Sequence, residues 1–172
     1  MNHAKLALSG LVLLAAPSAA AAHVTLKQQE APAGSTYEAV LNIGHGCEGS
    51  PTVAVRVRIP DGVVAVVPVP KPGWQLETKV ETYPASVQAS DGVFTEGVRE
   101  IAWSGGNLPD GQKEDFVFSS RLPDAEPGTV IYFPVVQECV EGVHRWIDMR
   151  PESDPAQHDE SPAPALTLTP GS

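Results

Sequence analysis

The chain is poor in basic and aromatic residues. Its 172 residues include 11 lysines and arginines against 21 aspartates and glutamates, for a formal net charge of −10. Because an acidic protein repels nucleic-acid phosphates and anionic lipid, we expect neither as a partner. The acidity is compatible with a cation as ligand, although it also simply favours solubility. Aromatic residues make up only 6% of the chain, which disfavours an aromatic platform for sugars.

Several enzyme motifs are also missing. The sequence contains no G-x-S-x-G nucleophile motif, no phosphate-binding loop and no H-E-x-x-H zinc signature. Hydrolase and nucleotide chemistry therefore lack support. The sequence shows no internal repeats either, so nothing indicates a repeat architecture.

No apolar run is long enough to cross a bilayer, which takes about 20 residues. The run over residues 6–16 follows Lys5 and precedes Ala20 and Ala22, which fit the A-x-A pattern of a signal-peptidase site. We therefore interpret residues 1–22 as a signal peptide cleaved after Ala22. The mature chain is then periplasmic or secreted and does not span a membrane. A buried N-terminal helix is the alternative.

Cysteine is scarce, and Cys47 and Cys139 are the only two. In an exported protein two cysteines usually form one disulfide bond. A pair of thiolate metal ligands is the alternative, which an oxidising compartment disfavours.

The body of the chain has the alternating pattern of β-strands. In residues 52–60 the side chains of Val53, Val55, Val57 and Ile59 share one face. Short strands separated by glycine and proline turns, without a helical period, predict an all-β antiparallel β-sandwich of the immunoglobulin-like or cupredoxin-like kind. The expected strands are 37–43, 52–60, 63–69, 74–81, 98–103, 114–121, 130–136 and 144–149.

The composition changes at the C-terminal end. Residues 151–164 are proline-rich, acidic and nearly free of large apolar residues, so they lack the apolar surface that would order them. We therefore expect one domain over residues 23–150 and a disordered tail over 151–172. Residues 165–170 alternate weakly and could dock as an edge strand.

Cleavage after Ala22 would make His23 the first residue, with a free α-amine beside its imidazole. The amine and Nδ1 can close a chelate ring on one metal ion, and Cu(II) favours nitrogen and oxygen ligands. The nearest acidic residue is Glu30. A turn from Gln28 to Pro32 could bring its carboxylate back towards His23. The alternative for Glu30 is a solvated loop carboxylate.

Several blocks of sequence, taken in their order along the chain, resemble one family. The blocks are "AHVTL" (22–26), "HGCEGSPT" (45–52), "KPGW" (71–74), "IAWSGGNLPDG" (101–111), "FPVVQEC" (133–139) and "RWIDM" (145–149). Because these blocks occur together, the mature chain is similar to the YcnI-like copper-binding family, which consists of exported domains with a monohistidine copper brace.

The resemblance implies a ligand set. His23 maps to the brace, Glu30 to the glutamate that supplies an oxygen, and Trp146 to the tryptophan that lies against the copper. The cysteine pair belongs to one branch of the family. It implies a disulfide that brings the loop of His45 and Glu48 near Glu138.

The remaining histidines and tryptophans have simpler interpretations. His45 in its glycine-rich loop is more typical of a backbone cap than of a ligand. His144 alternates with Trp146, so the two should share a face, and Trp146 itself could be a core residue. His158 lies in the expected tail and would bind metal only weakly. We expect Trp74 and Trp103 in the core or on a sheet face.

Three functions follow from these observations. The first is an exported Cu(II)-binding protein, a copper carrier or store and not an enzyme. Its partners would be the copper ion and other periplasmic or membrane copper-handling proteins. The second is an oxidative copper enzyme, in which His45 or His144 would have to add a third nitrogen to the His23 brace. The third is a structural or adhesive β-sandwich, because a fold does not fix a function.

Overall fold

The computed structural model describes residues 23–150 and 161–171. Residues 1–22, which carry the signal-peptide interpretation, and His158 lie outside the described residues. The described part is built from β-strands and contains no helix. The strands are β1 Thr25–Leu26, β2 Glu30–Pro32, β3 Thr36–Ile43, β4 Thr52–Arg58, β5 Val64–Pro68, β6 Gln75–Ala89, β7 Gly92–Leu108, β8 Glu114–Arg121, β9 Val130–Tyr132, β10 Val135–Cys139, β11 Val143–Trp146 and β12 Ala165–Thr169.

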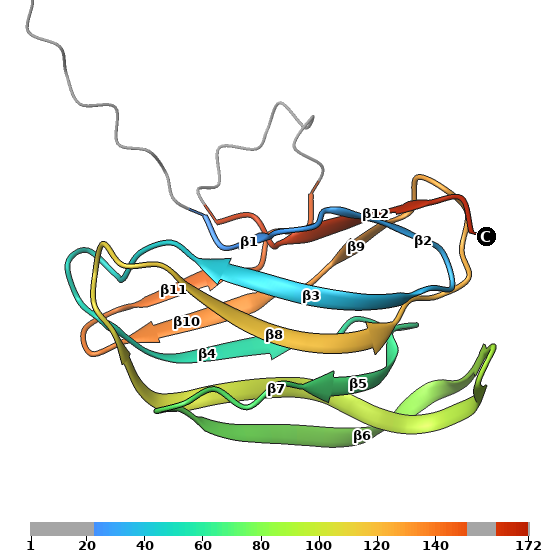
Figure 1. The fold of residues 1–172 in the computed structure, drawn as a ribbon, viewed down its shortest axis with the longest axis horizontal. Coiled ribbons are helices and arrows are strands. Elements are labelled where there is room, and N and C mark those ends of the chain that lie inside the picture. The colour runs from blue at the N-terminus through green and yellow to red at the C-terminus, as the bar shows by residue number, and fades with distance from the viewer. Residues whose placement is uncertain (1–22, 151–160, 172) are drawn as a thin grey trace, which may run out of the picture.

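Two sheets face each other, and a third closes one side (Figure 1). One is four-stranded in the order β1-β3-β8-β5, and the other is five-stranded in the order β11-β10-β4-β7-β6. The third sheet has the order β2-β12-β9. All pairings between these strands are antiparallel except that of β12 with β2, which is parallel. The expected antiparallel β-sandwich is therefore confirmed.

Alternation along the strands fills the space between the sheets. In β3 every second residue is buried, from Tyr37 to Ile43. Phe116 of β8 lies between Trp74 and Trp103, with ring centroids at 5.0 and 5.4 Å. Trp103 is fully buried, while Trp74 is partly buried against the core, as the sequence predicted for both.

Strand β4 departs from strict alternation at its start. The register against β7 shifts between Thr52 and Ala54, as it does between Glu138 and Cys139 on β10. This bulge turns Thr52 into the core and leaves Val53 only half-buried. A bulge adds one residue to a strand and so reverses which side chains face inward beyond it. The prediction that Val53 shares a face with Val55 and Val57 is therefore wrong.

The expected strand over residues 130–136 is divided in two. Strand β9 pairs with β12, whereas β10 pairs with β4 and β11. The change of sheet falls at Phe133 and Pro134, where Phe133 N donates to Pro164 O. Proline has no N–H for a ladder hydrogen bond, so a strand is readily interrupted there.

The β6–β7 hairpin extends beyond the expected strands at 74–81 and 98–103. Its two strands reach to residues 89 and 92, so the turn between them consists of residues 90 and 91. Most side chains of β6 are exposed. A strand with two solvated faces has no hydrophobic alternation, which is why the sequence pattern ended early.

Residues 161–171 belong to the fold. Strand β12 lies in the middle of its sheet, with Leu166 and Leu168 almost completely buried. Its docking was predicted, but its position at an edge was not correct. The domain boundary and disordered tail expected from residue 151 are therefore wrong for residues 161–171, while residues 151–160 lie outside the described residues.

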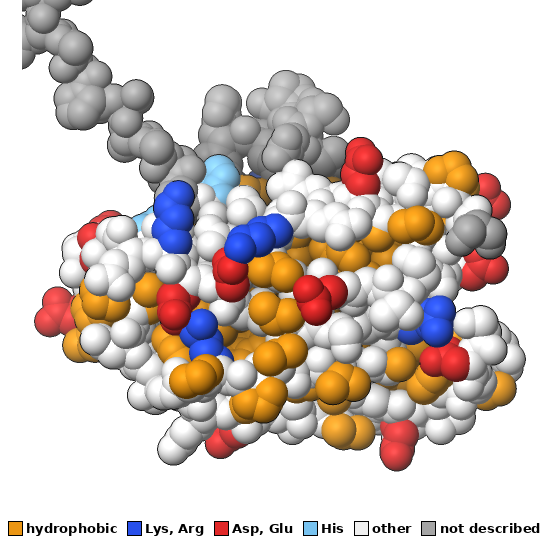
Figure 2. All heavy atoms as spheres, in the orientation of Figure 1, with side chains coloured by type: hydrophobic (Ala, Val, Ile, Leu, Met, Phe, Trp, Pro, Cys, Tyr) orange, Lys and Arg blue, Asp and Glu red, His pale blue; other side chains and the backbone are white. Residues whose placement is uncertain are grey.

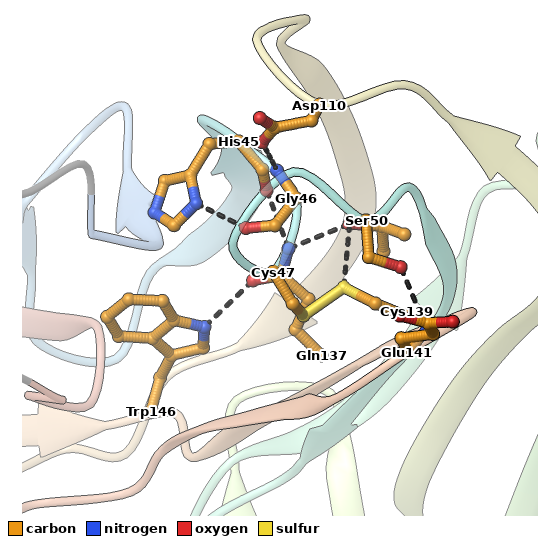
Figure 3. Close-up of a disulfide and its surroundings, with 10 residues drawn as sticks. His45, Gly46, Cys47, Ser50, Asp110, Gln137, Cys139, Glu141 and Trp146 are labelled. Atoms are coloured by element: carbon orange, nitrogen blue, oxygen red, sulfur yellow. Dashed lines mark hydrogen bonds between the residues drawn. A yellow bond between two sulfur atoms is a disulfide. The ribbon is translucent and has the colours of Figure 1, made fainter.

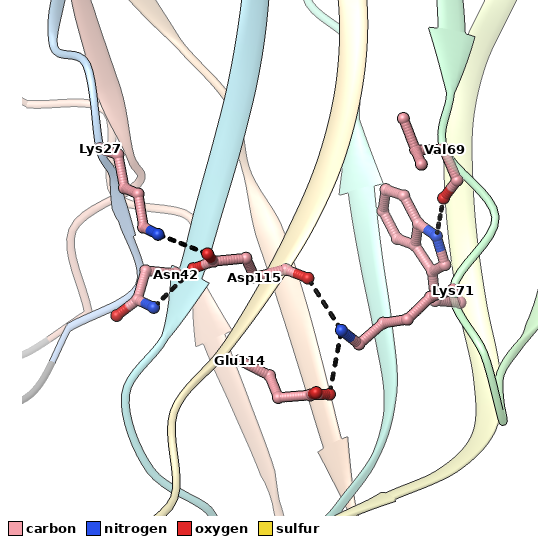
Figure 4. A network of polar contacts seen from close by, with 7 residues as sticks. Lys27, Asn42, Val69, Lys71, Glu114 and Asp115 are labelled. Carbon is pink, nitrogen blue, oxygen red and sulfur yellow. Dashed lines mark hydrogen bonds and ion pairs between the residues drawn. The ribbon is translucent and has the colours of Figure 1, made fainter.

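A network of hydrogen bonds and ion pairs connects β8 to the residue that follows the edge strand β1 and to the loop after β5 (Figure 4). The Asp115 carboxylate accepts hydrogen bonds from Lys27 and from Asn42, and the Asp115 carbonyl accepts one from Lys71. Partial burial works to raise the pKa of the Asp115 carboxyl. The hydrogen bonds from Lys27 and Asn42 and the charges of Lys27 and Lys71 outweigh that effect and hold the pKa below its usual value.

The surface has charges of both signs between apolar side chains on the face seen in Figure 2, and histidine reaches the surface near the start of β1. The described part of the chain has no helix long and apolar enough to cross a membrane.

Candidate metal site

Trp146 is the last residue of β11 and lies opposite Val135 of β10. Its side chain is 3% exposed and belongs to the hydrophobic core. The indole Nε1–H donates to Gln137 Oε1 at 3.0 Å. The one polar atom of the indole is therefore occupied inside the protein, and the rest of the ring is available for contacts with other rings.

Gln137 connects the strands around this tryptophan. It is 1% exposed, and its Nε2 donates to the His45 carbonyl at 2.6 Å and to Thr52 Oγ1 at 2.7 Å. Sequence reasoning missed this residue. A signal existed, because Gln137 lies between Val135 and Cys139 at the inward positions of a strand, where a polar side chain needs partners.

The loop that carries His45 is held at several points (Figure 3). The Cys47–Cys139 disulfide joins it to β10 with a Cα–Cα distance of 6.0 Å, and it confirms the predicted pairing. Gly46 N donates to Asp110 Oδ1 at 2.8 Å. Cys47 and Ser50 exchange two backbone hydrogen bonds of 2.9 Å. The backbone that follows His45 is therefore held by several contacts.

Three imidazoles surround the Trp146 indole. The ring centroids of His23, His45 and His144 lie 5.7, 6.2 and 5.4 Å from that of the indole. His45 and His144 also contact each other, edge to face, with centroids 5.8 Å apart. The prediction that His144 and Trp146 share a face is confirmed. The approach of His45 was not foreseen, because it depends on the fold of a loop.

His23 lies just before β1 and is half-buried. Its side chain lines a cleft of about 100 Å³ together with Gln29 and residues 162–165. In the uncut chain the nitrogen of His23 is part of a peptide bond. Its α-amine, and hence the brace, would exist only after cleavage in front of His23.

The structure does not gather the acidic candidates as expected. Glu30 is exposed and begins β2 opposite Thr167, so the expected turn through residue 30 is wrong. Glu138 pairs with Arg56 at 3.1 Å on the outer face of the sheet. Glu48 is exposed at φ 49° in the loop. The disulfide does bring the loop next to Cys139, but within the described residues His45, Glu48 and Glu138 do not form a group that could hold a metal ion.

Within residues 23–150 and 161–171, no group of three or more histidine, cysteine, aspartate or glutamate side chains could hold a metal ion. A brace needs fewer side chains, because one terminal histidine supplies two nitrogens. The side chain of His23 and the indole of Trp146 fit that arrangement by their proximity. Glu30 remains a prediction as the oxygen donor.

Residues 23–168 match the family described as "Domain of unknown function (DUF1775)". The chain belongs to this family. It is the YcnI-like family that the sequence blocks suggested, and the description names no ligand. The match begins at His23 and extends through most of β12, whose leucines complete the core.

Among solved structures, the chain is similar to an uncharacterized protein from Nocardia farcinica with an immunoglobulin-like fold. The identity is 25%, the TM-score is 0.64, and the likeness covers 86% of this chain and 98% of that one. This supports the immunoglobulin-like form of the expected β-sandwich. No curated protein matches the chain.

Proposed function

We propose that the protein is an exported Cu(II)-binding protein that carries or stores copper outside the cytoplasm. The observation that carries the proposal is the position of His23. It is the first residue of the family match and of the expected mature chain, and its imidazole lies 5.7 Å from Trp146. Its partners would be copper ions and other periplasmic or membrane proteins that handle copper.

The ligand chemistry rests on the terminal residue. His23 would offer its α-amine and Nδ1, and Glu30 would add a carboxylate oxygen. The free amine has a pKa of about 7.7–8.0, so binding near neutral pH displaces a proton. Nitrogen and oxygen donors of this kind suit Cu(II) in a tetragonal arrangement.

Trp146 would shield the metal and would not ligate it. The indole has no lone pair suited to ligation, and its N–H already donates to Gln137. Its π-face can still attract a cation. Because Gln137 holds the indole from the core side, the ring is rigid and protects the ion without changing position.

A catalytic copper site is the second candidate, since His45 and His144 lie beside the same indole. Such an enzyme would act on a substrate bound at the surface. All ten aromatic side chains lie within residues 23–150, and none of them is exposed, so no aromatic platform for a polysaccharide is present there. Turnover with reductant, peroxide and a polysaccharide would favour this candidate over the carrier.

The test compares Cu(II) binding by a chain that begins at His23 with one that keeps residues 17–22. These residues move the new amine too far from the imidazole for the two to share a chelate ring. We expect one tightly bound Cu(II) per chain in the first protein and a large loss of affinity in the second. Equal affinity in both would refute the brace.

Glu30 is tested separately. In the chain that begins at His23, Glu30→Gln should weaken Cu(II) binding, whereas Glu38→Gln, at an exposed position of β3, should not. Electron paramagnetic resonance of the bound Cu(II) should show the loss of one oxygen ligand in the Glu30 variant. An unchanged spectrum and affinity would remove Glu30 from the ligand set.

A further inference from the structure

We propose that His45 and His144 form a second metal-binding site, separate from the brace at His23. Their rings contact each other at 5.8 Å, with the indole of Trp146 beside both. The two residues come from the disulfide loop and from the edge strand β11. The site uses side chains only, so it depends neither on cleavage in front of His23 nor on the proposed copper brace.

The hydrogen bond of the His45 ring sets which of its nitrogens can bind metal. Nδ1 lies within hydrogen-bonding distance of the Gly46 carbonyl, which can only accept, so Nδ1 carries the proton. In the neutral imidazole Nε2 then holds the lone pair. Figure 3 shows this second nitrogen pointing away from the loop. Donation of one ring N–H to a carbonyl is the usual arrangement for a metal-binding histidine.

The support around His45 makes this orientation rigid. Gln137 binds the His45 carbonyl, Asp110 binds the next backbone N–H, and the disulfide anchors Cys47. A ligand fixed in advance loses little conformational entropy when the ion arrives. His144 is on an edge strand and is half-buried, so its ring has room to adjust.

The distance between the rings is close to that needed for one shared ion. Two imidazoles on a tetrahedral ion, with metal–nitrogen distances of about 2.0–2.1 Å, have centroids roughly 5 Å apart. The observed 5.8 Å needs a closure of under about 1 Å. Rotation of the His144 side chain alone can supply a movement of this size.

The donor set selects the class of ion. Two neutral imidazoles suit zinc, copper and nickel, while calcium and magnesium require oxygen ligands. The cysteines are joined in a disulfide and provide no thiolate. With water completing the coordination, we infer a site for a borderline divalent cation, of moderate affinity and open to exchange.

The experiment uses Zn²⁺ as the probe in a chain with His23→Gln, which removes the imidazole of the brace. Calorimetric titration should show one Zn²⁺ per chain. Adding His45→Gln or His144→Gln should weaken binding by at least about tenfold. His158→Gln, the matched control from outside the described residues, should leave it unchanged. Because both varied histidines are half-exposed, their substitution should not prevent folding, which near-ultraviolet circular dichroism checks.

A second measurement follows the rings themselves. In ¹⁵N-edited spectra of the His23→Gln protein, Zn²⁺ should shift Nε2 of His45 while Nδ1 keeps its proton. The second site would be overturned if neither His45→Gln nor His144→Gln weakened zinc binding, or if the His23→Gln protein bound no zinc at all. Neither result bears on the copper brace, because the brace is tested with Cu(II) in a protein that retains His23.

Discussion

Replacement of Gln137 by leucine tests whether one buried side chain organises the site. The change keeps the size of the side chain but leaves three partners without their hydrogen bonds: the Trp146 N–H, the His45 carbonyl and the Thr52 hydroxyl. Each buried polar group left unpaired costs about 1–3 kcal/mol. Thr52 Oγ1 keeps a contact of 3.8 Å with Cys139 Sγ. We therefore expect a total loss of about 2–6 kcal/mol from the two groups that remain unpaired.

That loss is a large part of the stability of a domain, which is typically about 5–15 kcal/mol. Urea unfolding, followed by tryptophan fluorescence with the disulfide intact, measures it. Gln75→Leu on β6 is the control, because Gln75 is exposed and should change stability by less than about 0.5 kcal/mol. If Gln137→Leu unfolds at the same urea concentration as the unaltered protein, the hydrogen-bonded role of Gln137 is refuted.

A double-mutant cycle separates the bond to the indole. Trp146→Phe removes the N–H and leaves Gln137 Oε1 without its donor. With Gln137→Leu also present, neither of these two groups remains unpaired, so the combined loss should be smaller than the sum of the single losses. Strict additivity would show that the bond between Gln137 and Trp146 contributes nothing.

Three further predictions concern the surrounding fold. Replacing Cys47 and Cys139 together by serine frees a loop with a sequence separation of 92 and should cost up to about 4–5 kcal/mol in urea unfolding; no loss would contradict the chain-entropy estimate. The lowered pKa of Asp115 stabilises the fold above the ordinary value of 3.8, and this stability is lost as pH falls through the folded value. Asp115→Asn should therefore be less stable at neutral pH, and its free energy of unfolding should fall less steeply as the pH is lowered. If the variant loses stability with acid as steeply as the unaltered protein, the network is contradicted. Gly106→Ala would place a Cβ 2.1 Å from Trp74 Cε2, so it should displace that ring, alter near-ultraviolet circular dichroism and cost about 1–3 kcal/mol; an unaltered spectrum would contradict the packing.

The strands were predictable where one face is buried and the other is solvated. The expected strand at 114–121 coincides with β8, whose side chains alternate between inside and outside. The same logic correctly placed His144 and Trp146 on one face. It failed for the outer part of β6, which is exposed on both faces, and for β9 and β10, where the chain changes sheets at Pro134.

The site was predictable only in part, because most of it is assembled across the fold. His23 could be singled out from the adjoining cleavage pattern, which is local in sequence. The contact between His45 and His144 joins residues far apart in the chain and depends on the disulfide loop. The role of Gln137 depends on three different partners, which a one-dimensional pattern does not contain. Likewise, the central place of β12 depends on β2 and β9 on either side of it.

The central claim is that a free amine and a ring nitrogen of the same residue hold one copper ion. Intact mass spectrometry under native conditions, on the full chain exported by a bacterial host with and without copper, tests both parts at once. We predict a single species that begins at His23 and gains the mass of at least one copper ion. A chain that begins at another residue, or one that begins at His23 and gains no copper, would contradict it.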